Sequence, residues 1–267
     1  MSLPFQGTAW ALSADGIAAA ADKLAVFASE IWTVLAVETS GCGYLPDRRP
    51  QICFERHIFH RLTNGKYDDR DISDPRPGGY GAPGEHQYER LALAITKNRE
   101  AALQGASWGI GQIMGENFAA AGHNSVEDFV TSMTQSEDDQ LAAMAHFLLS
   151  NKLHIALQAH DWAAFALRYN GPDYTLNRYD VRLSAAFKKY STGSLPDLNA
   201  RAMQLYLTYL GFDPGPVDGV AGERTLMSLA EFHRRAGMVG SNLINAEVVE
   251  KLKDVLSYQV AGASELV

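Results

Sequence analysis

Glu38 is the first residue in this sequence whose type and position could do chemistry. It lies on the apolar stripe of a helix predicted over residues 25–39, four residues after Val34. Burial and the helix C-terminus both disfavour a charged carboxylate, so we expect a raised pKa for this side chain. Such a group can act as the general acid that cleaves a glycosidic bond. The alternative is a structural role, in which Glu38 caps a turn or pairs with Arg48 or Arg49.

Two later segments place polar groups where a saccharide could be held. Residues 107–112 (SWGIGQ) combine two glycines, whose backbone can approach a ligand closely, with an aromatic face and an amide side chain. Residues 168–172 (RYNGP) end a predicted helix and leave a tyrosine and an asparagine at its tip. Either segment alone is more often a turn than a site. The candidate substrate-binding residues are Ser107, Trp108, Gly109, Gln112, Tyr169 and Asn170.

The order of these segments resembles that of the lysozyme-like superfamily. More closely, VETSGCGYLPDRRP (37–50), ICFERHIF (52–59) and SWGIGQIM (107–114) resemble the N-acetylmuramidase family of bacteriophage endolysins, over about residues 13–190. The resemblance implies a mostly α, lysozyme-like catalytic domain with a small β element. It implies cleavage of the β-1,4 bond between N-acetylmuramic acid and N-acetylglucosamine, with Glu38 as the catalytic acid. By the same match, Gln112, Tyr169 and Asn170 would line the cleft.

A hydrolase of this kind can use a second carboxylate as base or nucleophile. We prefer Glu55, which ends a strand predicted over residues 50–55 and lies opposite Phe54 by alternation, to Asp47. The alternative for Glu55 is an ion pair with a basic residue such as Arg56. The superfamily also contains lytic transglycosylases, which need no second carboxylate because the muramoyl 6-hydroxyl attacks and gives 1,6-anhydro products. The choice stays open at this point.

The histidines and cysteines do not predict a metal site. His57 and His60 share a helical face, but the H-E-x-x-H order is absent and no spacing supplies a third ligand. Cys42 and Cys53 lack C-x-x-C spacing and cannot form a disulfide scaffold. We therefore expect neither a metal nor a cofactor.

Helices must position the candidate residues. Further helices are predicted over residues 85–104, 140–159 and 161–169, and the second, apolar on nearly every side, belongs at the centre of its domain. Residues 68–84 are rich in Gly, Pro and Asp, and a loop of this length is often functional. We expect it to form a flap or rim.

A polar, Gly- and Pro-containing segment, residues 188–196, divides the chain into a catalytic domain, 1–190, and a second domain, 195–267. Apolar stripes in the second domain predict a small three-helix bundle. Its LGF at 210–212 and VDGVAGERT at 217–225 resemble the peptidoglycan-binding domain type 1 family, with a histidine at 233 where that family usually has glutamine. The resemblance implies a cell-wall anchor. The alternative is a bundle that only stabilises the enzyme.

Composition narrows the classes of function. The chain has 267 residues, of which 46% are hydrophobic and 20% charged, which is typical of a globular protein and excludes a disordered or coiled-coil chain. A net charge of −8 has the wrong sign for binding nucleic acid. No stretch approaches the roughly 20 apolar residues of a membrane span, and the N-terminus has no signal-peptide pattern.

Together these features predict a monomeric peptidoglycan hydrolase. The resemblance to endolysins implies that it stays in the cytoplasm of the host bacterium until a holin-type partner releases it to the cell wall. Two alternatives are a lytic transglycosylase and a non-catalytic protein that binds the wall or belongs to the phage particle.

Overall fold

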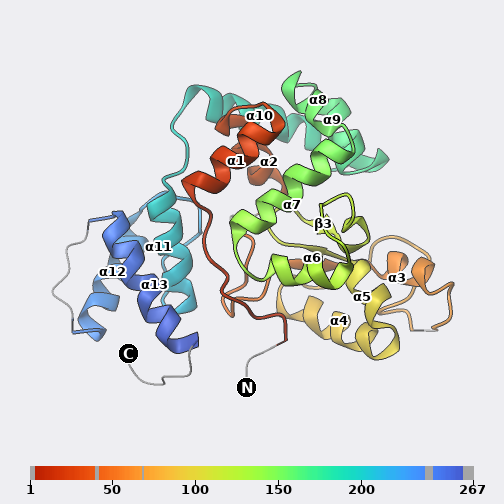
Figure 1. The fold of residues 1–267 in the computed structure, drawn as a ribbon, viewed down its shortest axis with the longest axis horizontal. Coiled ribbons are helices and arrows are strands. Elements are labelled where there is room, and N and C mark those ends of the chain that lie inside the picture. Colours follow the sequence, from red (N-terminus) through yellow and green to blue (C-terminus); the bar gives the residue numbers. More distant parts are fainter. Residues whose placement is uncertain (1–3, 40–41, 68, 238–242, 261–267) are drawn as a thin grey trace.

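A computed structural model describes residues 4–39, 42–67, 69–237 and 243–260. It is mostly helical with one small antiparallel sheet, which confirms the expected fold class (Figure 1). The α-helices are α1 (Ala14–Leu24), α2 (Ala28–Glu38), α3 (Arg56–Leu62), α4 (Glu85–Lys97), α5 (Arg99–Gln104), α6 (Val126–Met133), α7 (Glu137–Ser150), α8 (Leu153–Gln158), α9 (Trp162–Tyr169), α10 (Tyr179–Thr192), α11 (Leu198–Tyr209), α12 (Glu223–Arg235) and α13 (Ala246–Val260). The remaining elements are β1 (Ile52–Phe54), β2 (Ala106–Trp108), β3 (Ile113–Met114) and the 3-10 helices η1 (Gly115–Asn117) and η2 (Pro172–Thr175).

Helix α2 carries Glu38 and is shorter at both ends than the predicted 25–39. Ala25 is the left-handed C-cap of α1, with φ 51°, so the chain turns before α2 begins. The Glu30 carboxylate then accepts a hydrogen bond from the Phe27 N–H, which fixes the start of α2. Thr39 is extended and ends the helix directly after Glu38. The carboxyl group therefore lies at the very end of the helix.

Local capping also divides two of the predicted helices. Residues 85–104 form α4 and α5, because Asn98 is extended and its side chain accepts a hydrogen bond from the Ala101 N–H. Residues 140–159 lie in α7 and α8, which are separated at the left-handed Lys152. Helix α7 is central as expected, with buried residues on several sides of its axis.

The sheet joins two motifs that are far apart in sequence. Strand β2 lies between β1 and β3, and Ile52 pairs with Trp108 across the β1–β2 register. This pairing places the segment after Glu38 beside the turn at 109–112. The strand predicted over 50–55 is confirmed in its central residues, 52–54.

The C-terminal residues form the expected three-helix bundle, with Met203, Leu207 and Phe232 fully buried in its core. The predicted linker is partly wrong, because α10 continues to Thr192. The ring of Tyr190 lies 6.5 Å from that of Trp32 on α2, which supports this last stretch of helix. The segment between α10 and α11, residues 193–197, overlaps the end of the predicted linker.

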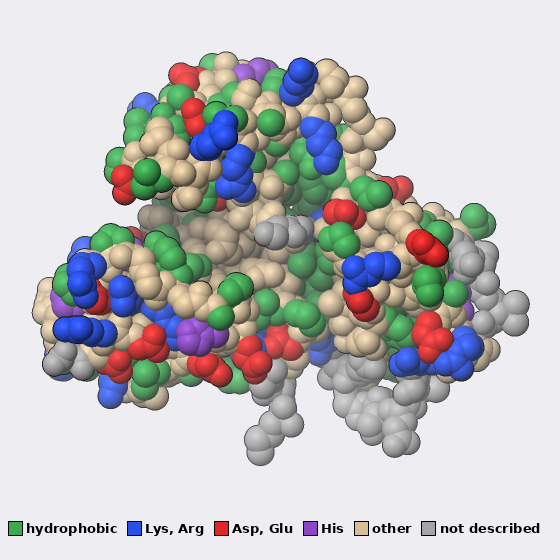
Figure 2. Space-filling model, turned by 180° about the vertical axis from the view of Figure 1, so that it is seen from behind, with side chains coloured by type: hydrophobic (Ala, Val, Ile, Leu, Met, Phe, Trp, Pro, Cys, Tyr) green, Lys and Arg blue, Asp and Glu red, His purple; other side chains and the backbone are tan. Residues whose placement is uncertain are grey.

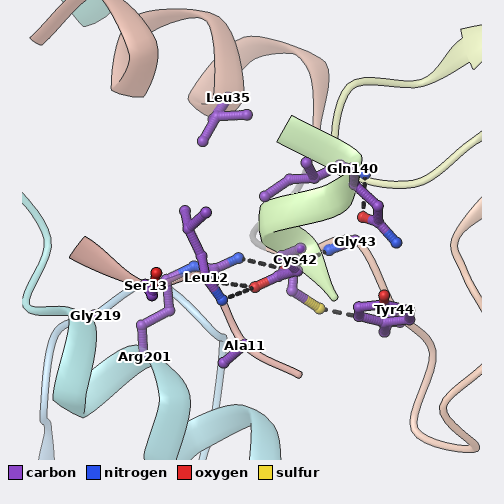
Figure 3. A network of polar contacts seen from close by, with 12 residues as sticks. Ala11, Leu12, Ser13, Leu35, Cys42, Gly43, Tyr44, Gln140, Arg201 and Gly219 are labelled. Atoms are coloured by element: carbon purple, nitrogen blue, oxygen red, sulfur yellow. Dashed lines mark hydrogen bonds and ion pairs between the residues drawn. The ribbon is translucent and has the colours of Figure 1, made fainter. Parts of the chain in front are cut away.

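A buried polar network joins the bundle to the rest of the chain (Figure 3). The carboxylate of Glu137, at the start of α7, forms an ion pair with Arg201 on α11 and accepts one hydrogen bond from that side chain at 2.7 Å. It also accepts hydrogen bonds at 2.8 Å from the N–H groups of Leu12 and Gly43. The N-terminal segment lies between the two parts, and the Tyr209 hydroxyl donates to the Ala9 carbonyl. Within the described residues, no helix has the length and apolar character needed to cross a membrane.

Candidate active site

A cavity of about 440 Å³ opens beside the C-terminal end of α2. Glu38 and Thr39 line it from the end of α2, and β1 and the loop before α4 also contribute to its lining. The predicted flap contributes Tyr80, Gly81 and Pro83, so the C-terminal part of this segment does form a rim of the cavity. The other lining residues are Cys42, Gln51, Ile52, Cys53, Gln87 and Gln112.

Glu38 is held at this cavity by two residues from the other side of the catalytic region. The Nδ2 of Asn170 donates a hydrogen bond of 3.0 Å to its Oε1. Arg182 on α10 donates a hydrogen bond of 2.9 Å to the carbonyl of Val37 and places its positive charge nearby. Burial raises the pKa of Glu38 to about 7, and Asn170 and Arg182 oppose this shift because they stabilise the charged form. The carboxyl group can therefore hold a proton near neutral pH.

Gln112 lies on the cavity wall in a strained conformation, with φ 47°. Its amide is fixed within the protein, because Nε2 donates to the Gly109 carbonyl at 2.9 Å and Oε1 accepts from the Ser107 hydroxyl at 2.9 Å. The structure therefore places Glu38 and Gln112 on one cavity.

The other residues of 107–112 support this wall from behind. The Trp108 ring is fully buried and its Nε1 donates to the Leu103 carbonyl, so the expectation that it offers an aromatic face to a saccharide is wrong. Ser107 is also buried. The N–H of Gly109 donates to the Gln51 carbonyl and is not directed at a ligand. Glycine is required there because φ is +70° and a Cβ would lie 2.5 Å from Gln140.

Tyr169 and Asn170 at the end of α9 join the third motif to the other two. The Tyr169 hydroxyl donates a short hydrogen bond of 2.6 Å to the Gly111 carbonyl. This bond holds the 109–112 turn against α9, while Asn170 contacts Glu38. The Oδ1 of Asn170 is buried and has no hydrogen-bond partner among the described residues. The three motifs thus meet at one place in the fold.

Comparison with known proteins agrees with this arrangement. Residues 28–191 match the model of the N-acetylmuramidase family. The chain belongs to this family. The crystal structure of the Burkholderia AP3 phage endolysin is similar, with 39% sequence identity, a TM-score of 0.62, and coverage of 71% of this chain and 72% of that one. No curated protein matches the chain. As a member of this family, the muramidase is a peptidoglycan-degrading enzyme.

Glu55, the preferred second carboxylate, does not line the cavity of the muramidase. It lies just after β1, and its Oε2 is buried 3.2 Å from Nδ1 of His57 without hydrogen-bond geometry. Burial raises the pKa of Glu55 to about 7, against the opposing effects of Arg90 and of the Tyr80 hydroxyl. The catalytic role of Glu55 stays a prediction. Asp47, the alternative, is paired with Arg49.

The two histidines that share a face of α3 have separate partners in the muramidase. His57 lies beside Glu55, as above, and Nδ1 of His60 lies 3.0 Å from the Ser73 hydroxyl. Within the described ranges, no three His, Cys, Asp or Glu side chains are grouped so as to hold a metal ion.

Sequence reasoning missed several residues of the muramidase site. Gln51 and Gln87 line the cavity, and Arg182 supports the end of α2 from a position 144 residues later in the chain. The Gly- and Pro-rich composition of 68–84 was the signal for the rim, although it did not single out Tyr80. Nothing in its local pattern distinguishes Arg182 from any other exposed helical arginine.

Proposed function

We propose that this muramidase acts as an endolysin that hydrolyses the β-1,4 bond between N-acetylmuramic acid and N-acetylglucosamine, with Glu38 as general acid. The observation that carries the proposal is the burial of the Glu38 carboxyl group at the cavity, which raises its pKa to about 7. The Asn170 amide, 3.0 Å from Oε1, can orient this group. A proton donor of this kind assists departure of the leaving oxygen as an oxocarbenium-like state develops. Similarity to the AP3 phage endolysin supports the biological role. We propose that the protein acts as a monomer after a holin-type partner has released it to the wall.

A lytic transglycosylase is a second candidate, because Glu38 is the only acidic residue among those described as lining the cavity. In that reaction the muramoyl 6-hydroxyl attacks in place of water, so no second carboxylate is needed. Mass spectrometry of digested peptidoglycan distinguishes the two reactions. We expect products with reducing muramic acid ends. Products with 1,6-anhydro-muramoyl ends would contradict hydrolysis and establish the transglycosylase.

The pH dependence of cleavage should report the pKa of Glu38. We expect kcat/KM to fall as the pH rises through about 7, because the general acid then loses its proton. Asn170→Ala should move this fall to higher pH, because the amide of Asn170 stabilises the charged carboxylate. Initial rates on a soluble oligosaccharide between pH 5 and 9 test this.

Asn151→Ala, at an exposed asparagine on the C-terminal cap of α7, serves as the control and should leave the profile unchanged. A descending limb at the same pH in the Asn170→Ala enzyme and the parent would count against Glu38 as the titrating acid.

We also propose that the C-terminal residues 195–267 act as a peptidoglycan-binding unit. The Gln204 side chain supports this, because it accepts hydrogen bonds from the N–H groups of Asp218 and Gly219 and donates to the Val220 carbonyl, so it shapes the motif loop. Val220 is 67% exposed on that loop, whereas His233 is buried. Val220→Asp in a full-length Glu38→Gln protein should weaken sedimentation with insoluble peptidoglycan. Unchanged sedimentation would contradict this role.

A further inference from the structure

A second cavity, of about 200 Å³, lies where α2 meets the C-terminal bundle. Its walls come from both parts of the chain. Trp32, Ala36 and Tyr190 contribute from the family-matched region, and Pro196, Val217 and Asp218 contribute from the start of the bundle and its motif loop. We call this cavity the junction pocket.

The junction pocket continues the candidate active site. Thr39, the residue after Glu38, lines both cavities. Seen from behind, the surface has a hollow beneath the lobe of α8, α9 and α10, and hydrophobic side chains are visible in its depth on the side of the bundle (Figure 2). The substrate is a long polymer, so a strand that passes over Glu38 can extend into this neighbouring space.

The two walls of the junction pocket are held in place before any ligand binds. Arg201, which lines the pocket from the bundle, forms a buried ion pair with Glu137 at the start of α7, and this pair fixes the bundle to the family-matched region. The Tyr206 hydroxyl also accepts a hydrogen bond of 3.1 Å from the Ala11 N–H, which ties the bundle to the N-terminal segment. A preformed pocket binds its ligand without the cost of ordering the walls.

The chemistry of the pocket favours a sugar ring over a peptide. Most of the lining is apolar or aromatic, and the charge of Arg201 is compensated by Glu137. Asp218 and Thr39 add a few polar groups to this lining. A mainly apolar pocket with a few polar groups suits a sugar ring, which has apolar faces and a few hydroxyl and amide groups. A peptide stem with several charges would leave them without partners.

We infer that the junction pocket is a further saccharide subsite, which binds an N-acetylhexosamine unit of the strand being cleaved, away from the scissile bond. The inference rests on the proposed function. It makes the bundle part of the substrate cleft, in addition to any role as an anchor.

The test compares oligosaccharides of different lengths, using the full-length protein. The substrates are peptide-free tetra-, hexa- and octasaccharides of alternating N-acetylglucosamine and N-acetylmuramic acid. Ala36→Trp fills the pocket from an exposed position on α2. Ala18→Trp, on the exposed side of α1 and outside both cavities, is the matched control. The measured quantity is the ratio of kcat/KM for the longest and the shortest substrate that is cleaved.

We expect the longest substrate to have a kcat/KM about tenfold higher than the shortest one in the parent and in Ala18→Trp, which is a modest gain from filling one pocket. In Ala36→Trp we expect a ratio near one. A parent ratio near one would overturn the subsite while leaving the proposed function standing. An unchanged ratio in Ala36→Trp, or a length effect that appears only when stem peptides are attached, would also overturn it. If no oligosaccharide is cleaved, the proposed function fails and the subsite with it.

Discussion

Glu38→Gln should lower kcat for peptidoglycan cleavage by about 10²- to 10⁴-fold, the usual contribution of a general acid. Glutamine keeps the shape of the side chain and an oxygen that can accept the hydrogen bond from Asn170, but it has no acidic proton to transfer to the leaving oxygen. Clearing of a cell-wall suspension, followed by turbidity, measures the loss. Glu100→Gln, at an exposed position in the first turn of α5 and outside the cavity, removes one negative charge elsewhere and should retain full activity.

The free energy of unfolding of the same variant tests whether unfolding causes the loss of activity. The pKa of Glu38 is raised from 4.5 to about 7 by burial, so ionisation favours the unfolded chain. The resulting loss of stability is absent below pH 4.5, grows as the pH rises to about 7 and does not increase further above that pH. Glutamine does not ionise, so the variant should be more stable than the parent at pH 8, by up to about 3 kcal/mol, and should lose this advantage below pH 4.5. A well-folded variant that clears the suspension as fast as the parent would refute the assignment of the acid.

Arg201→Met should destabilise the whole protein by about 3 to 5 kcal/mol, because it leaves Glu137 buried without its charged partner. Glu137 also holds the N–H groups of Leu12 and Gly43, so a shift of this carboxylate affects the N-terminal segment and the chain that follows Glu38. Denaturant unfolding at pH 7 gives the change in the free energy of unfolding.

The matched control for this prediction is Arg224→Met in the same bundle. Arg224 pairs with Asp213 at the surface, and exposed pairs of this kind are worth about 0 to 1 kcal/mol. A double variant, Arg201→Met with Glu137→Leu, should be much less unstable than the sum of the two single changes. An Arg201→Met protein as stable as the control would show that this ion pair does not hold the two parts of the chain together.

Local sequence features were sufficient for much of the fold and for the central residue of the site. The apolar spacing in α2 placed Glu38 at the end of a partly buried helix, and the composition of 68–84 predicted a rim. Two predicted helices, 85–104 and 140–159, are each divided in the structure, and the reasons are also local. Asn98 and Lys152 each interrupt a continuous apolar pattern through a cap or a left-handed backbone. Apolar periodicity does not register these single-residue breaks.

Other features depend on contacts between distant segments. Trp108 looks like a sugar-binding ring beside two glycines, but pairing of β2 with β1 and packing against Phe5 bury it. Tyr80 and Gln87 are wall residues because of contacts between distant segments, since the Gln87 side chain accepts a hydrogen bond from the Phe54 N–H and donates one to the Tyr80 carbonyl. Glu55 illustrates the same limit, because alternation along the strand does not predict that its carboxyl group is buried beside His57 and outside the residues that line the cavity.

The sequence by itself predicted Glu38 as the candidate acid, set the order of the three motifs and predicted that a separate helical bundle follows. These are properties of spacing and local backbone preference, which act over a few residues. The tertiary structure decided which groups surround Glu38, that Arg182 supports its helix, and that Glu137 binds Arg201 across the junction. Those hydrogen-bonded partners are 64 to 145 residues apart in the chain, and only the packing of the whole fold brings them within hydrogen-bond distance.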